Sequence, residues 1–206
     1  MTAIPPSASR LALLTAGVAF ALGAAAVGLG IANEAPLAWG FGCACLLQIA
    51  PSLALVHRIR EGLGNRGLDG ERRALRITSH LLRFLALGLA IASAFAWTGG
   101  DTPKAGSLDL ALAGTTLLVW LGLWLGKRRL GALHPSLALD TARSRALAAC
   151  AGLWLAGGLL GLVFPWADPA TGLLLAGWLF RDGRTVAKAT TVSLVGCGGC
   201  GSCGCG

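Results

Sequence analysis

The chain has 206 residues, of which 55% are hydrophobic and only 13% are charged, and its net charge is +8. A soluble domain averages roughly 45–50% apolar and 25% charged residues, so this composition argues against a cytosolic enzyme and indicates a membrane protein. A basic balance in a soluble protein would suggest nucleic-acid binding. No aromatic residue alternates with the arginines of the basic segment 57–79 to stack on bases. We therefore expect no nucleic-acid partner, and we expect this segment to contact anionic lipid headgroups.

Apolar runs recur along the chain and approach the length of about 20 residues that a spanning helix needs. In chain order they cover residues 11–31, 36–56, 80–97, 108–126, 146–164 and a shorter run, 169–180. The first run also has features of a signal sequence, which remains an alternative to a first span. The last run reaches spanning length only if it extends to Val186 with Arg181 snorkelling toward the interface. Between residues 69 and 76, the pattern after a glycine-punctuated turn predicts a helix start.

The basic residues predict the orientation of these spans, because Lys and Arg collect in short cytoplasmic loops. With a cytoplasmic N-terminus, almost all of them fall on the cytoplasmic side, Lys104 falls outside, and Arg83 lies at the inner edge of the third span. Trp120 and Trp154 are expected deeper in the membrane than the other tryptophans, which lie near the predicted span ends. The sequence thus predicts an all-α, six-helix transmembrane bundle over residues 1–190, with both termini cytoplasmic, in the cell (inner) membrane. A flexible Gly/Cys-rich tail, residues 191–206, is expected to follow it.

The tail carries the strongest chemical motif, a CxxCxxCxC run formed by Cys197, Cys200, Cys203 and Cys205. Four thiolates match the tetrahedral shell of a soft metal in number, and the intervening Gly and Ser let the backbone wrap around an ion. In the cytoplasm these thiols would stay reduced, which favours metal binding over disulfides. The expected ion is zinc or copper(I), with an iron–sulfur cluster as a less favoured ligand. Redox sensing, or a disordered tail without function, remain alternatives.

Other candidate residues carry weaker signals. Cys43 and Cys45 lie about 200° apart on a helix, so they cannot face one site, and both are expected to pack as small apolar residues, as is Cys150. His57, His80 and His134 are expected in loops or at the interface. No GxSxG, HExxH or P-loop motif occurs. We therefore expect no enzymatic activity.

Two stretches resemble the transmembrane domain of the cation diffusion facilitator (cation efflux) family: Ser136-Leu-Ala-Leu-Asp-Thr-Ala-Arg-Ser-Arg145, and Trp166-Ala-Asp-Pro-Ala-Thr-Gly-Leu-Leu-Leu-Ala-Gly-Trp178 with the nearby Arg181-Asp-Gly-Arg184. The resemblance implies six spans, cytoplasmic termini and exchange of protons for zinc or a related ion. That family places two polar metal ligands on each of spans two and five. The matching positions here are Cys43, Leu47, Arg143 and Leu147, so the usual ligands are replaced. We also expect the family's cytoplasmic metal-binding domain to be lacking.

These observations predict a multi-pass membrane protein of cation-efflux type. It would handle or transport a soft divalent or monovalent metal ion, with the cysteine tail as its cytoplasmic metal-binding element. Its expected partners are the lipid bilayer, the metal ion and a second copy of the chain in a homodimer. The main alternative is a non-transporting membrane scaffold or assembly partner of a metal or redox complex. A membrane thiol oxidoreductase is a third possibility.

Overall fold

A computed structural model of the chain describes residues 7–61, 68–99 and 106–192, and this described part is helical apart from short turns. The four cysteines of the predicted metal site lie outside the described residues. The α-helices are α1 (Ser7–Ala32), α2 (Pro36–Leu46), α3 (Ile49–Arg60), α4 (Leu68–Gly99), α5 (Ser107–Lys127), α6 (Pro135–Gly161) and α7 (Ala167–Val192), and a short 3-10 turn, η1 (Leu130–Ala132), links α5 to α6. The helix predicted to start near residues 69–76 is α4, which begins at Leu68.

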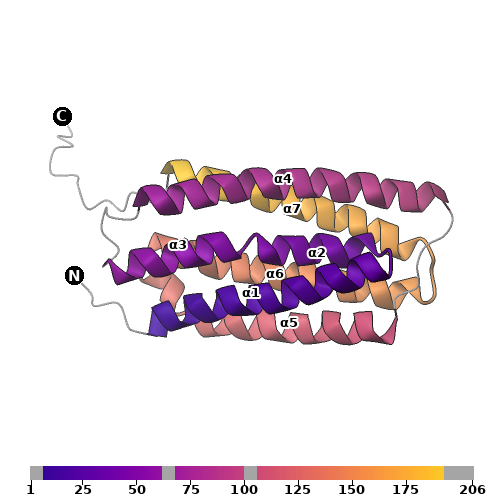
Figure 1. Cartoon of the computed structure of the whole chain (residues 1–206), viewed down its shortest axis with the longest axis horizontal. Helices are drawn as coiled ribbons and strands as arrows, with labels where there is room; N and C mark the ends of the chain where they lie inside the picture. The colour runs from indigo at the N-terminus through magenta and orange to yellow at the C-terminus, as the bar shows by residue number, and fades with distance from the viewer. Residues whose placement is uncertain (1–6, 62–67, 100–105, 193–206) are drawn as a thin grey trace.

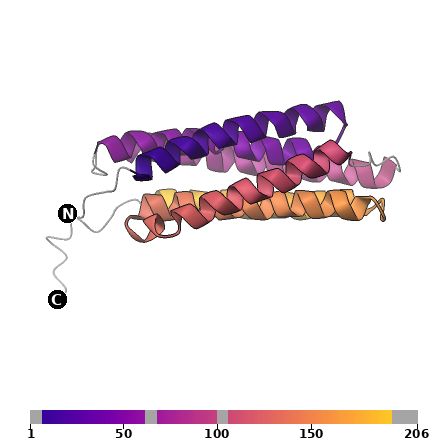
Figure 2. The ribbon, with the colours of Figure 1, turned by 90° about the horizontal axis from the view of Figure 1, so that it is seen from below.

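The helices run lengthwise as an elongated bundle in which successive passes alternate in direction (Figures 1 and 2). The most extensive contacts join α4 to α7, α1 to α2, α5 to α6 and α6 to α7. Five segments are long and apolar enough to cross a membrane: Ala8–Ala32, Pro36–Arg60, Leu68–Thr98, Ser107–Lys127 and Ser136–Gly161. The membrane class and the all-helical fold expected from composition are thereby supported. Helix α7 has spanning length but a more polar sequence, and it is absent from this set of five.

The second pass is broken into α2 and α3. Leu47 and Gln48 lie between the two helices, and the Gln48 N–H donates to the carbonyl of Cys45 instead of that of Ala44. Pro51 has no N–H to offer the Leu47 carbonyl, so the helix cannot continue regularly through this point. The break places the Gln48 side chain in the protein interior, where it is almost fully buried.

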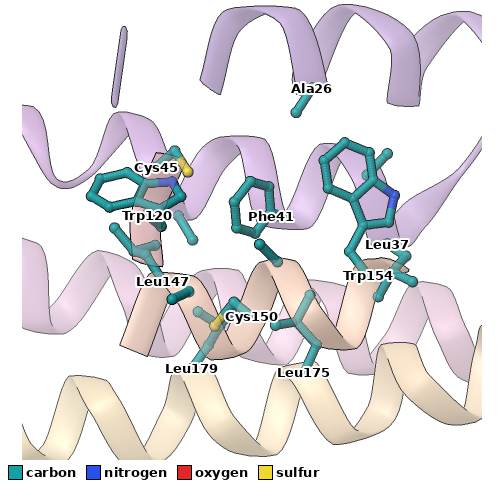
Figure 3. Packing of buried hydrophobic residues seen from close by; sticks show 14 of the residues in the cluster. Ala26, Leu37, Phe41, Cys45, Trp120, Leu147, Cys150, Trp154, Leu175 and Leu179 are labelled. Carbon is teal, nitrogen blue, oxygen red and sulfur yellow. The ribbon is translucent and has the colours of Figure 1, made fainter. Parts of the chain in front are cut away.

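The apolar core lies where α1, α2, α4, α5, α6 and α7 meet (Figure 3). Trp120 is fully buried, and Trp154 is nearly so and stacks on Phe41 with ring centroids 5.3 Å apart. Both tryptophans are therefore part of the packed protein interior. Large apolar side chains such as Phe84, Phe95 and Leu118 cover the outer surface, each about 70% exposed in the isolated chain. An apolar exterior of this kind is what a surrounding lipid would cover.

Helices α1 and α2 pack closely through glycines. A Cβ added at Gly30 would lie 2.4 Å from the backbone nitrogen of Trp39, whereas one added at Gly28 would meet nothing within 4 Å. Small residues allow membrane helices to approach in this way. We expect Gly30→Ala to destabilise the fold by roughly 1–3 kcal/mol through overpacking. Thermal unfolding in detergent would measure the change.

The matched control for this substitution is Gly28→Ala, one half-turn away on the same helix. It adds the same methyl group in open space. Because Ala has the higher helix propensity, this variant should be neutral or more stable by up to about 1 kcal/mol. Equal destabilisation by both variants would contradict the close α1–α2 contact.

Two helices extend further than their apolar runs indicated. Helix α6 begins at Pro135 and not near residue 146, and α7 continues past Phe180 to Val192. In both cases the added turns are rich in charged residues, which lower the hydropathy of a sliding window without preventing helix formation. The extension of α6 moves Asp140, Arg143 and Ser144 from an expected loop into the packed bundle, where all three are buried.

Candidate functional site

A buried ionic cluster lies at the end of the bundle where α3, α5 and α7 end and α4 and α6 begin (Figure 1). Its first ion pair joins the last residue of α5 to the second turn of α6. Lys127 Nζ lies 2.5 Å from Asp140 Oδ2 and also donates to Ser144 Oγ at 3.1 Å. The other carboxylate oxygen of Asp140 accepts from Gln48 Nε2 at 3.2 Å. The helix break at residues 47–48 thus supplies one donor of this cluster.

The second ion pair joins α3 to α4. Arg58 Nη1 donates to Glu71 Oε2 and, at 2.7 Å, to the hydroxyl of Ser136, which also lies 3.3 Å from the same Glu71 oxygen. Arg58 is 2% exposed and Glu71 is 3% exposed. Taking two charges out of water costs several kcal/mol per ion, and only close pairing with further hydrogen bonds offsets it. The contact with Ser136 ties α6 to this pair.

A third buried cation, Arg143, lies between the two pairs and α7. It is 3% exposed, and the carboxylates whose charges act on it are Asp182 and Asp140. Its Nε and Nη1 atoms have no hydrogen-bond partner within the described part of the chain. Arg143, Asp140, Glu71 and Ser136 line a void of about 10 Å³. A void of this size is close to the minimum that holds one water molecule, and its polar walls could satisfy that water.

The arrangement limits what the interior can bind. The carboxylates of Asp140 and Glu71 already accept from an ammonium and a guanidinium, and Arg143 adds a third positive charge. A metal ion entering this cluster would have to displace covalently attached cations. Over the described ranges, no group of three or more His, Cys, Asp and Glu side chains is placed to hold a metal. The cluster is therefore built to hold helices together and is unsuited to coordinating a cation.

The cysteines within the bundle lie apart from this cluster. Cys45 is buried beside Trp120, and Cys150 is buried between α6 and α7 near Leu179 (Figure 3). Cys43 is only partly buried. The different exposures of Cys43 and Cys45 agree with the expectation that they face different directions. The packing of Cys45 and Cys150 among apolar side chains agrees with their expected role as small core residues.

The buried cations were missed at the level of sequence. Arg58, Lys127 and Arg143 were read as part of the loop charge that orients the spans, yet all three are inside the protein. One available signal was the helical spacing of polar residues at positions 136, 140, 143 and 144, which places them on one face of a helix. Such a face needs polar partners when it is buried. The sequence does not say which residues provide them.

His134 caps α6, with Nδ1 accepting from the Ser136 N–H at 3.2 Å. Burial, followed by the charge of Arg58, lowers the pKa of His134 below its usual value of 6.5. In the fold this imidazole binds its proton less readily than in the unfolded chain. Stability should therefore fall as the pH drops through about 6.5 toward the lower pKa of the folded state. His134→Asn keeps a capping side chain, so it should reduce this pH dependence.

The measurement is thermal unfolding in detergent at a series of pH values between 5 and 8. His134→Ala serves as the comparison, because it removes both the proton site and the cap. It should lower stability by about 1 kcal/mol at pH 8, where His134→Asn stays close to the parent protein. An unchanged acid response in both variants would assign the pH dependence to other groups.

Over the described residues, the fold and the cluster together define an all-helical membrane-type protein with two buried ion pairs and a third buried cation at one end. No protein-family model matches the chain, and no curated protein matches it.

Proposed function

We propose that this protein is a multi-pass membrane protein that binds a soft metal ion through its cysteine tail, with the helical bundle as a rigid anchor. The observation that carries the anchoring role is the internal pairing of Asp140 with Lys127 and of Glu71 with Arg58. These are the buried carboxylates of the bundle end from which the tail follows α7 in sequence. Since their charge is already balanced, they offer a passing metal ion little attraction.

The metal-binding part of the proposal rests on Cys197, Cys200, Cys203 and Cys205. Cysteine thiols release their protons when they bind zinc or copper(I) as thiolates, so capture should weaken in acid. With α7 as a sixth pass and the basic end of the bundle on the cytoplasmic side, the tail would lie in a reducing compartment. The protein would then concentrate a soft ion at the inner membrane surface and present it to a partner.

The test compares metal content between matched variants purified in detergent. The parent protein should carry about one more zinc or copper(I) equivalent than a variant with the four tail cysteines changed to serine. The control changes Cys43, Cys45 and Cys150 to serine and should keep the metal. Equal metal content in the parent and the tail variant would refute the proposal.

Cation efflux through the bundle is the second candidate, and the resemblance to the cation diffusion facilitator family favours it. Proteoliposomes loaded with a metal-sensitive dye distinguish the two functions. The anchor proposal expects no zinc or copper(I) flux above that of empty liposomes. Metal flux that persists after the tail cysteines are changed to serine would refute the anchor proposal and show that the bundle transports the ion.

The side on which the tail lies is open to direct measurement. A membrane-impermeant thiol reagent applied to intact cells should leave the tail cysteines unlabelled, while the same reagent should label them after lysis. Labelling in intact cells would place the tail outside, where disulfide chemistry would be favoured over metal binding.

A further inference from the structure

A lateral groove runs between α4 and α7, the two helices with the most extensive mutual contact. They lie side by side along the bundle (Figure 1). The groove has a volume of about 540 Å³, within the range of roughly 300–1,000 Å³ that ligand pockets occupy. Phe84 and Leu87 of α4 and Gly177 and Phe180 of α7 form much of its apolar wall, and all four are exposed at the bundle surface.

One end of this groove is basic. His80 and Arg83 line it, and Arg83 Nε is buried without a hydrogen-bond partner within the described ranges. Arg76 lies one helical turn before His80 on α4, and Arg184 lies one turn beyond Phe180 on α7, so both continue the two walls past the apolar part. Both arginines are exposed. None of these four residues forms an ion pair with any residue that the structure describes.

The boundary between the apolar and basic parts of the groove lies where a membrane-spanning stretch of α4 ends. Residues 84–98 of α4 carry no charged side chain and span about 22 Å at 1.5 Å per residue, which is most of the roughly 30 Å of a bilayer core. Arg83 directly precedes this stretch. The basic end then falls at the level of the headgroups. We propose that the α4–α7 groove binds one anionic phospholipid, with an acyl chain along Phe84, Leu87 and Gly177 and the phosphate at Arg83 and Arg184.

Charge favours a lipid over a second copy of this chain as the occupant. In a two-fold dimer across this groove with both chains in the same orientation, the basic ends would face each other and repel. An anionic headgroup would instead supply the missing negative charge. Each basic residue near the surface raises the affinity for an anionic lipid by about tenfold or less. This partner is independent of the metal proposed above.

Native mass spectrometry of the detergent-purified protein tests the site, with phosphatidylglycerol and phosphatidylcholine of identical acyl chains as probes. The parent protein should retain one phosphatidylglycerol per chain and bind phosphatidylcholine at least several-fold more weakly. Arg83→Gln combined with Arg184→Gln should weaken phosphatidylglycerol binding by roughly tenfold or more. If Arg83 proves necessary for folding, Arg76→Gln combined with Arg184→Gln tests the same site, because it changes only exposed residues.

A groove-filling variant probes the acyl chain separately. A Cβ added at Gly177 meets nothing within 4 Å, so Gly177→Leu should occupy the groove without disturbing the helices. It should reduce lipid retention, whereas Gly122→Leu, an equally open glycine on α5, should not. Arg129→Gln is the matched charge control, since Arg129 is exposed and lies away from the groove.

Three results would overturn this proposal. Equal retention of the two lipids would show that the headgroup is not recognised. Unchanged retention in the arginine and Gly177 variants, with Gly122→Leu and Arg129→Gln behaving like the parent, would place the lipid elsewhere. A parent dimer that Gly177→Leu converts to a monomer would assign the groove to a second copy of the chain.

Discussion

Changing Asp140 to Asn should lower the free energy of unfolding by about 3–5 kcal/mol, because it leaves the Lys127 ammonium buried without a counter-charge. Lys127 is 2% exposed and its Nζ atom has Asp140 and Ser144 as hydrogen-bond acceptors, so water cannot replace the carboxylate without opening the bundle. For a chain of this length, this loss corresponds to a fall in Tm of roughly 10 °C. Thermal unfolding in detergent, followed by tryptophan fluorescence, measures it.

The control for this prediction removes both charges. Lys127→Met combined with Asp140→Leu removes both partners of this ion pair and leaves no unpaired Lys127 ammonium, so it should be far less destabilising than Asp140→Asn alone. Arg129→Met changes an exposed basic residue near Lys127 and should stay within about 0.5 kcal/mol of the parent. If the double variant is as unstable as the single one, the damage comes from lost packing, and the ion pair does not have the role assigned to it.

Glu71→Gln should destabilise the protein by a similar 3–5 kcal/mol, since Arg58 would lose its only ion-pair partner among the described residues. The effect should persist at high salt, because screening acts weakly on a pair that is almost fully buried. Arg60→Met, at an exposed position on the same helix as Arg58, is the matched control and should change stability little. Unfolding at low and at 1 M salt provides the measurement.

Ser136 gives this second prediction an additional readout. Its hydroxyl contacts both Arg58 and Glu71, so Ser136→Ala and Glu71→Gln should not have additive effects. A double-mutant cycle should give a coupling energy of about 0.5–3 kcal/mol. Strict additivity would mean that α6 is not tied to this ion pair.

Composition and apolar run length were enough to predict the helical class and five of the candidate spans. Each run contains a long stretch whose burial in lipid or protein is favourable regardless of its neighbours. The start of α6 could not be predicted in this way, because Asp140 and Arg143 are acceptable inside the bundle only when distant residues pair with them. The break after Leu46 depends on Pro51, whose effect is local, but a hydropathy window does not register a missing N–H.

The candidate cluster shows the same limit more strongly. A basic residue at a helix end can orient the chain in the membrane, or it can pair with a buried carboxylate. The residue type is the same in both cases, so the amino-acid composition does not distinguish them. Arg60 is exposed, whereas Arg58, two positions earlier, is buried. In the same way Arg129 is exposed, whereas Lys127, two positions earlier, is buried. Helical phase distinguishes them, but only after the packed face of each helix is known. The tail motif was evident from sequence because its four cysteines lie close together in the chain.

The two ion pairs have a consequence for how the protein enters the membrane. In each pair the partners are only 13 residues apart and belong to consecutive passes, α3 with α4 and α5 with α6. Each hairpin can therefore neutralise its own charges as soon as its second helix emerges, before any other hairpin arrives. Insertion of an isolated charge into lipid is costly. The chain can avoid that cost by inserting in helical pairs, so separating the partners onto different hairpins should impair biogenesis even where the final contacts are preserved.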